Sequence, residues 1–418
     1  MLAKRIFLLL VFSLPFMKPA VHYPVVLADL LFLLFAAAYG IDLLRGRARL
    51  KWRRHWWVLG VYLFALACSV AASLDPRISA FKMATELYLV GLAAGADLMV
   101  EDERDLKRFL LAWLAASAIV ALLDVAALAA FPFAPHSALV RYNSFGFGSL
   151  PPGSYPRFSA TFLNANMMCD YLTVSLLLLV VAIERAWLPR RLGVALLGAT
   201  VIAALTTISP GLGGVGLAAG LWIWAKRGQV PRWIARLGLT GGLAIATAFI
   251  LITAFMPIVH STAPFLIHVP LLDVTLAPTG RVLTWSAAFR EFAAHPLLGH
   301  GIGVDAVHVY FESPSGGQHL TDAHNSFLNI AAQCGLVGLA GELLLVWWVF
   351  RQSPPWLVTG PNLGMIRLAL GLGFLDAFAY QGLSGSFEDA RYLWLLLGLF
   401  MAAVRLGRAA EADPVPAR

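Results

Sequence analysis

Apolar residues recur along this chain in long, nearly uninterrupted runs. A run of about 20 such residues can cross a bilayer as an α-helix, because lipid offers no partners to backbone groups that are not bonded within the helix. The runs lie near residues 5–18, 23–44, 56–73, 80–100, 107–131, 166–184, 192–208, 210–225, 237–257, 326–350, 365–383 and 391–405. The pattern predicts an all-α, polytopic membrane protein with about twelve transmembrane helices, in a single integral membrane domain over residues 1–418.

Composition supports this prediction. Hydrophobic residues make up 60% of the 418 residues and charged residues 13%, and the mean hydropathy is +0.76. A soluble domain is nearer half apolar and a quarter charged, so a soluble enzyme is excluded. Cysteine chemistry is also excluded, because the three cysteines are scattered singly through apolar runs. We interpret the first run, which follows Lys4 and Arg5, as an uncleaved span and not as a signal peptide.

The net charge of +8 does not indicate nucleic-acid binding, because the basic residues lie in short loops between apolar runs. Twelve spans with both termini cytoplasmic place 23 basic residues inside and 8 outside, as the positive-inside rule requires. Residues 406–418 are then a cytoplasmic tail. Two outside segments are long, residues 132–165 and residues 258–325, and connections of that length are usually functional.

The second long segment holds seven of the ten histidines. We expect a short helix that begins at Thr279–Gly280–Arg281 and runs to about Ala294. A turn region rich in Pro and Gly should follow at His295–Gly303, and then a mixed segment that ends at Asn325.

Four motifs follow one another from residue 280 of this segment to residue 338 of the next apolar run. They are Gly280–Arg281–x–x–x–Trp285, His295–Pro296–Leu297–Leu298–Gly299–His300–Gly301–Ile302–Gly303, Ala323–His324–Asn325–Ser326–Phe327–Leu328 and Gly335–Leu336–Val337–Gly338. In this order and spacing they resemble the O-antigen ligase and polymerase superfamily, bacterial inner-membrane glycosyltransferases of the C type that transfer a glycan from undecaprenyl diphosphate. Upstream, residues 157–166 resemble the family pattern Arg–x–x–Gly–x–x–x–Asn–Pro–Asn, with Ala160 and Ala165 where Gly and Pro are usual.

One position departs from the family. The family commonly has Ser–Arg–Gly where this chain reads Ser209–Pro210–Gly211, and that arginine is thought to hold the donor diphosphate. We therefore expect that this phosphate contact is either missing or supplied by another cation, with Arg157 and Arg141 as candidates.

The resemblance implies an inverting, metal-independent O-antigen ligase of the bacterial inner membrane. Its donor would be an undecaprenyl-diphosphate-linked glycan and its acceptor lipid A–core, with membrane lipid as surroundings and no cofactor. Residues 258–325 would form a large periplasmic loop with the catalytic motif, and residues 132–165 a first periplasmic loop.

The chemistry assigns roles to particular residues. A guanidinium matches the charge that builds on a leaving diphosphate, so Arg281 is the first candidate for that contact. His324 is the candidate base for the acceptor hydroxyl, with Asn325 or Asp322 orienting its ring. The predicted substrate-binding residues are Arg157, Asn164, Asn166, His300, Asn325 and Arg391, and Glu388 and Asp389 would either pair with Arg391 or close the donor pocket.

Several alternatives stay open. A polymerase would use the same donor, and Arg290 and Gly301 fit a loose Arg–x10–Gly pattern of polymerase loops. A protein O-oligosaccharyltransferase is disfavoured because the chain ends just after the last span. A transporter or flippase would use acidic residues inside the apolar runs.

The sequence Gly211–x–Gly213–x–x–Gly216 follows a membrane span and is better explained by helix packing than by dinucleotide binding. A zinc site at Glu312, His319, Asp322 and His324 is disfavoured, because these potential ligands are loosely spaced in a loop.

Overall fold

A computed structural model gives the fold. It describes residues 2–18, 25–149, 152–209, 216, 220, 255–257, 266–270, 273–278, 280–313, 316–353, 363–380, 382–383, 385 and 390–412. Nearly all of the predicted spans 210–225 and 237–257 lies outside the described residues. So do Pro210, Gly211, Gly213, Glu388 and Asp389.

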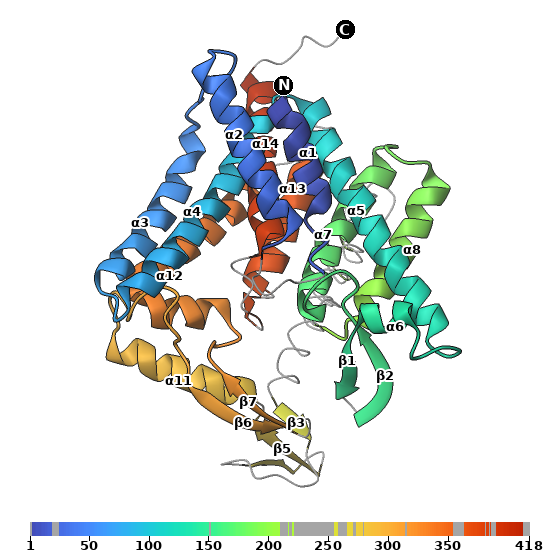
Figure 1. Ribbon diagram of the computed structural model, residues 1–418, viewed down its shortest axis with the longest axis vertical. Coiled ribbons are helices and arrows are strands. Elements are labelled where there is room, and N and C mark those ends of the chain that lie inside the picture. Colours follow the sequence, from blue (N-terminus) through green and yellow to red (C-terminus); the bar gives the residue numbers. More distant parts are fainter. Residues whose placement is uncertain are drawn as a thin grey trace.

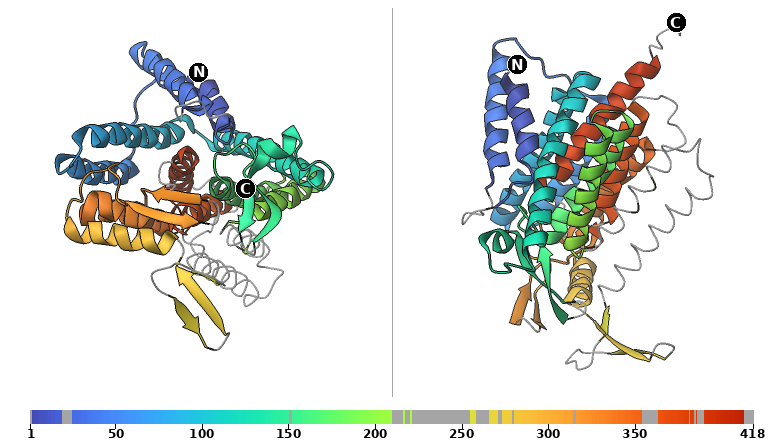
Figure 2. Two further views of the ribbon diagram at one scale, coloured as in Figure 1. Left: turned by 60° about the horizontal axis from the view of Figure 1, so that its bottom comes forward. Right: turned by 90° about the vertical axis from the view of Figure 1, so that its right-hand side faces the viewer.

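Long helices run side by side and form a bundle (Figure 1). The helices are α1 (Leu2–Ser13), α2 (Leu27–Leu44), η1 (Arg54–Trp56), α3 (Trp57–Ala71), α4 (Pro76–Met99), α5 (Glu103–Ala130), α6 (Ala138–Asn143), α7 (Ala165–Glu184), α8 (Arg190–Thr206), α11 (Gly280–Ala294), α12 (Ser326–Gln352), α13 (Leu363–Phe374), η2 (Leu375–Tyr380) and α14 (Arg391–Ala412). The start of α1 and the end of α14 lie at one end of the bundle, here called the terminal end. Helix α11 and the strands lie at the other, here called the loop end (Figures 1 and 2).

Helices are found at ten of the twelve positions where apolar runs predicted spans. Within the described part of the chain, six are long and apolar enough to cross a membrane. The protein is therefore a membrane protein with a largely helical fold, and twelve crossings remain a prediction.

Short antiparallel strands build much of the loop end. They are β1 (Ser144–Ser149), β2 (Pro152–Phe158), β3 (Phe255–Pro257), β4 (Ile267–Val269), β5 (Val274–Pro278), β6 (Val309–Ser313) and β7 (Gly316–Leu320). β1 pairs with β2, β6 pairs with β7, and β5 lies between β3 and β4. The all-α prediction holds for the bundle but did not include these strands, whose runs are too short and too rich in Gly and Pro for a clear alternating pattern.

Among the six candidate spans in the described part of the chain, α7 is the most enclosed. In its apolar window 83% of the residues are buried, against 11% in α2. Side chains pack around α7 on several sides: Trp113 of α5 stacks on Tyr171 with ring centroids 4.7 Å apart and donates its indole N–H to Ser175 Oγ. Because α7 begins at the loop end, this packing holds its first turn in a fixed place.

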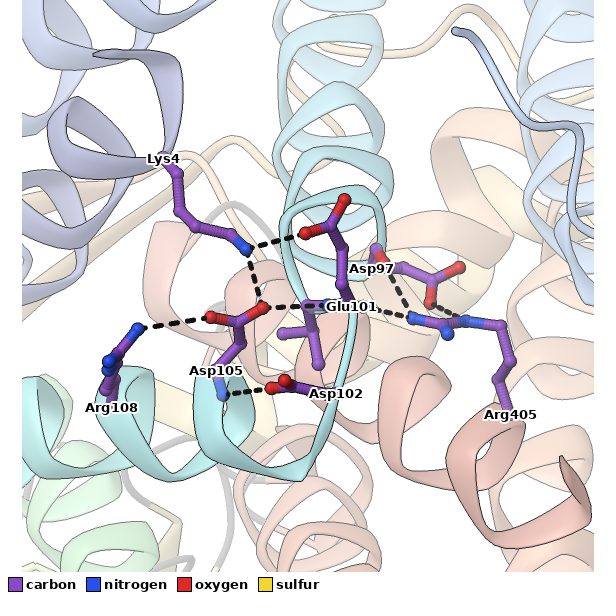
Figure 3. Close-up of polar contacts among 8 residues, drawn as sticks. Lys4, Asp97, Glu101, Asp102, Asp105, Arg108 and Arg405 are labelled. Carbon is purple, nitrogen blue, oxygen red and sulfur yellow. Dashed lines mark hydrogen bonds and ion pairs between the residues drawn. The ribbon is translucent and has the colours of Figure 1, made fainter. Parts of the chain in front are cut away.

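Ion pairs hold the helices together at the terminal end (Figure 3). Arg405 of α14 donates from Nε to Asp97 Oδ1 of α4 at 3.1 Å, and the Asp97 side chain is fully buried. Lys4 of α1 lies 3.0 Å from Glu101 and 2.6 Å from Asp105 of α5. Removing one partner from a buried pair leaves an uncompensated charge, so these contacts fix the helix ends relative to one another.

Helix α12 is broken at Gly335, where φ is 63° and ψ is −162°. The turn at His295–Gly303 docks into the break. The Pro296 carbonyl accepts a hydrogen bond from Leu336 N at 2.8 Å, and the Gln333 carbonyl accepts one from the same turn at 3.0 Å. The second and fourth sequence motifs are therefore two halves of one packing contact.

We predict that Gly335→Ala destabilises the protein strongly. A Cβ at this position would collide with the backbone of Leu297, and a positive φ combined with a ψ near 180° alone costs a residue with a side chain about 1–3 kcal/mol. The thermal unfolding temperature of detergent-purified protein should fall by several degrees. Gly198→Ala in α8 is the matched control, because its Cβ would meet nothing within 4 Å. Equal unfolding temperatures for the two variants would contradict the role of the Gly335 break.

Candidate functional site

His324 stands at the loop end, just before α12. Its Nδ1 lies 2.8 Å from Asp322 Oδ1, and the same carboxylate oxygen accepts a hydrogen bond from the His324 backbone N at 2.5 Å. The backbone of His324 has φ 47°, in the left-handed region. Its side chain is 43% exposed, so the ring is oriented on one side and accessible from outside. Of the two residues proposed to orient the ring, Asp322 makes the contact.

Asn325 has a different local role. Its side chain caps α12 by accepting a hydrogen bond from Leu328 N at 3.1 Å, and its Nδ2 donates to the Leu383 carbonyl at 3.2 Å. The neighbouring Ser326 hydroxyl donates to the Gly385 carbonyl at 3.1 Å. The segment before α14 is thus attached to the loop that holds His324. Substrate binding by Asn325 stays a prediction.

Arg281 lies in the first turn of α11, which begins at Gly280 as the sequence predicted. The Thr284 hydroxyl, one turn further along α11, is within hydrogen-bond distance of two carbonyl oxygens, that of Arg281 at 2.9 Å and that of Ala323 at 3.1 Å. Ala323 precedes His324 in the chain. The start of α11 and the His324 loop are therefore held side by side.

Arg157 projects from β2. Its Nε donates to the Thr207 carbonyl at 2.7 Å, and its guanidinium donates to Asn166 Oδ1 at 2.5 Å. It also lies 5.2 Å from the ring centre of Phe145. Thr207 follows α8, three residues before Pro210. Arg157 is thus bonded to the backbone three residues before Pro210, the position at which the sequence departs from the family pattern.

Arg157 and Arg281 act on each other electrostatically. The pKa of Arg281 is lowered, first because the side chain is largely removed from water and second because the positive charge of Arg157 is near. Arg281 nevertheless stays a cation at neutral pH, because a guanidinium does not lose its proton in proteins. Two guanidinium groups from separate parts of the chain therefore share one region of the loop end.

The start of α7 shapes the surroundings of Arg157. Asn164 caps α7 by accepting a hydrogen bond from Asn166 N at 2.8 Å, and this leaves Asn166 Oδ1 to hold Arg157. Ala160 has φ 42°, a conformation that glycine adopts without cost. The structure thus explains why the family prefers Gly at this place.

Arg391 begins α14 and makes a two-point ion pair with Asp29 of α2, with Nε and Nη2 at 2.5 and 2.8 Å from the two carboxylate oxygens. Tyr88 of α4 donates its hydroxyl to the same carboxylate at 2.7 Å. Arg391 therefore joins three helices at the loop end. Its predicted contact with substrate remains untested.

His300 is buried in the turn that docks on α12. Its Nε2 lies 3.4 Å from the Val304 carbonyl, and its own carbonyl accepts a hydrogen bond from Leu74 N at 2.9 Å. These contacts face α3 and α4. They indicate a packing role, and substrate binding by His300 stays a prediction.

Sequence reasoning missed several residues that position the site. Thr284, Thr207 and Asp29 each contact a candidate residue, but Thr284 is an ordinary hydroxyl residue of α11 and Thr207 makes its contact through a backbone carbonyl just after α8. Of these three residues, only Asp29 could have been suspected from the sequence, because a carboxylate inside an apolar run is often functional. Among the described residues no group of three or more His, Cys, Asp or Glu side chains is placed to hold a metal ion.

Comparison with known proteins agrees with the motifs. A family model described as O-antigen ligase matches residues 192–342, which include α11, the docked turn, His324 and the first part of α12. No curated protein matches the chain. The matched family indicates a glycosyltransferase-like enzyme that uses lipid-linked glycans in a membrane. The match covers residues 192–342 and supports the resemblance of this part of the chain to the O-antigen ligase and polymerase superfamily.

Proposed function

We propose that the protein is an inverting O-antigen ligase. It transfers a polysaccharide from undecaprenyl diphosphate to the terminal sugar of lipid A–core, on the periplasmic face of the bacterial inner membrane. The observation that carries this proposal is the gathering of Arg157, Arg281 and the Asp322–His324 pair at the loop end of the bundle.

The two arginines suit a diphosphate. Arg281 occupies the first turn of α11, where unpaired backbone N–H groups already make the helix end positive. A diphosphate placed there would be stabilised by both guanidinium groups and by the helix end.

The Asp322–His324 pair suits proton removal from an acceptor hydroxyl. With Nδ1 protonated and donating to Asp322, Nε2 is left as the acceptor of a proton. In the proposed step the acceptor oxygen bonds to the anomeric carbon and its proton passes to Nε2. The bond from that carbon to the diphosphate oxygen breaks, and the electron pair leaves with the diphosphate.

Complementation of defined bacterial mutants tests the function. In cells that lack their own ligase, the protein should restore long glycan on lipid A–core, and the glycan on the carrier lipid should fall. If it restores chain length in a polymerase-deficient strain but leaves ligase-deficient cells uncapped, the ligase proposal is wrong and the polymerase alternative is favoured. The transporter alternative would be supported if the protein complements neither strain but transports a lipid-linked substrate.

We predict that transfer by the purified protein continues in the presence of a chelator. Guanidinium groups can supply the positive charge that a metal ion supplies in other phosphate-handling sites. Rates with and without EDTA should agree within about twofold. Loss of transfer in EDTA that Mg²⁺ or Mn²⁺ restores would overturn the metal-independent mechanism.

A further inference from the structure

A cavity of about 410 Å³ opens at the terminal end of the bundle, away from the candidate site. Its lining residues come from the start of α5 and from the turn between α7 and α8. They are Asp102, Glu103, Arg104, Lys107, Arg185 and Trp187. The volume falls within the range of cavities that hold small ligands.

The charges of this cavity favour an anion. Arg185 is paired with Glu103 at 3.1 Å. Asp102 uses its carboxylate to cap α5 by accepting a hydrogen bond from Asp105 N at 2.8 Å (Figure 3). Within the described part of the chain, Arg104 and Lys107 have no carboxylate partner. The three basic side chains of the lining thus exceed the two acidic ones by one charge, and Arg104 and Lys107 are the cations that no carboxylate of the described residues holds.

The surroundings indicate a lipid. The cavity lies at the start of α5 and just after the end of α7, and both helices are apolar enough to span a membrane. Lys107 places its ammonium 5.7 Å from the ring centre of Trp187, so a cation and an indole face the same space. Tryptophan is enriched at the level of lipid headgroups, and basic pockets between helices at that level bind anionic headgroups.

We propose that this cavity binds the phosphate-bearing headgroup of an anionic phospholipid. Arg104 and Lys107 contact the phosphate, and Trp187 lies along the headgroup and the first part of the acyl chains. The proposal does not depend on the assigned reaction, because none of its residues belongs to the loop end.

Native mass spectrometry of the detergent-purified full chain, titrated with phosphatidylglycerol, tests the proposal. The double variant Arg104→Gln/Lys107→Gln should bind the lipid on the order of tenfold more weakly, because each cation near an anionic lipid contributes substantially to binding. The matched control is Arg190→Gln/Arg191→Gln. It removes the same charge from the exposed start of α8, at the same end of the bundle but outside the cavity lining.

Each outcome decides the question. The site is supported if only the cavity variant binds the lipid more weakly, and if replacing Lys107 by arginine instead of glutamine restores the affinity. Equal losses in the cavity variant and the control mean that only overall charge matters, and this overturns the site. Equal binding of phosphatidylcholine by the unmodified protein also overturns it. Displacement of the lipid by millimolar inorganic phosphate alone would identify a free-anion site and refute the lipid assignment.

Discussion

Replacing His324 by alanine is expected to reduce glycan transfer by about 10²–10⁴-fold, the usual contribution of a positioned general base. His324 is the candidate base because its ring is fixed by Asp322 at 2.8 Å and remains accessible on its other side. The measurement is the rate of transfer from lipid-linked glycan to lipid A–core by purified protein, with the amount of inserted protein determined in parallel.

Two further variants make this result specific. Asp322→Asn should retain the shape of the loop but lose the charged partner of Nδ1, so transfer should fall by less than in His324→Ala. His319→Ala serves as the control, because this exposed histidine lies on β7 against the ring of Tyr310. Near-normal transfer by His324→Ala would sink the assignment of the base, and an equal loss in His319→Ala would point to general damage to the loop end.

Arg157→Ala is expected to be nearly as damaging as Arg281→Ala. Each should lose on the order of 3 kcal/mol of transition-state stabilisation, as removal of one oxyanion donor does in other enzymes. The reason is that Pro210 stands where the family usually has an arginine, and Arg157 is bonded to the carbonyl of Thr207 just before that position. The measurement is kcat/KM for the donor.

Substitutions on the same elements separate this explanation from simple loss of charge. Arg281→Lys retains the positive charge but loses the planar fork of donors, so its activity should stay well below that of the unmodified protein. Arg290→Ala removes an exposed arginine from the same helix and should have little effect on the ligase reaction. Full activity in Arg157→Ala would refute the compensation by Arg157 but would leave the family assignment intact.

The positions of the long helices were predictable from the sequence because hydropathy is a local property. The start of α11 was predictable for a similar reason, since Thr279–Gly280 interrupts the preceding pattern just before the helix. The short strands were not, because pairs such as Tyr310 with His319 are set by partners across a turn. Their apolar and polar positions alternate over too few residues to be distinguished from irregular loop.

Contacts within the candidate site were less predictable. The motifs identified Arg281 and His324, but not the Thr284 bond to the Ala323 carbonyl, 39 residues away, that joins them. The pairing of Arg391 with Asp29 joins residues 362 positions apart. No local pattern carries such information, because it arises only when separate helices pack. The motif around His300 was recognisable as a unit, but only the packing shows that it fits the break in α12.

The contrast between α7 and α2 bears on how this protein tolerates change over evolutionary time. A helix that meets lipid on most of its surface needs only to stay apolar, so leucine, isoleucine, valine and phenylalanine can replace one another freely along α2. A helix enclosed by protein must fit a neighbour at almost every position, and its residues also fix where Asn164 and Asn166 stand. Among diverging homologues, the residues of α2 should therefore be replaced often, but by other apolar residues, whereas the individual side chains of α7 should be conserved.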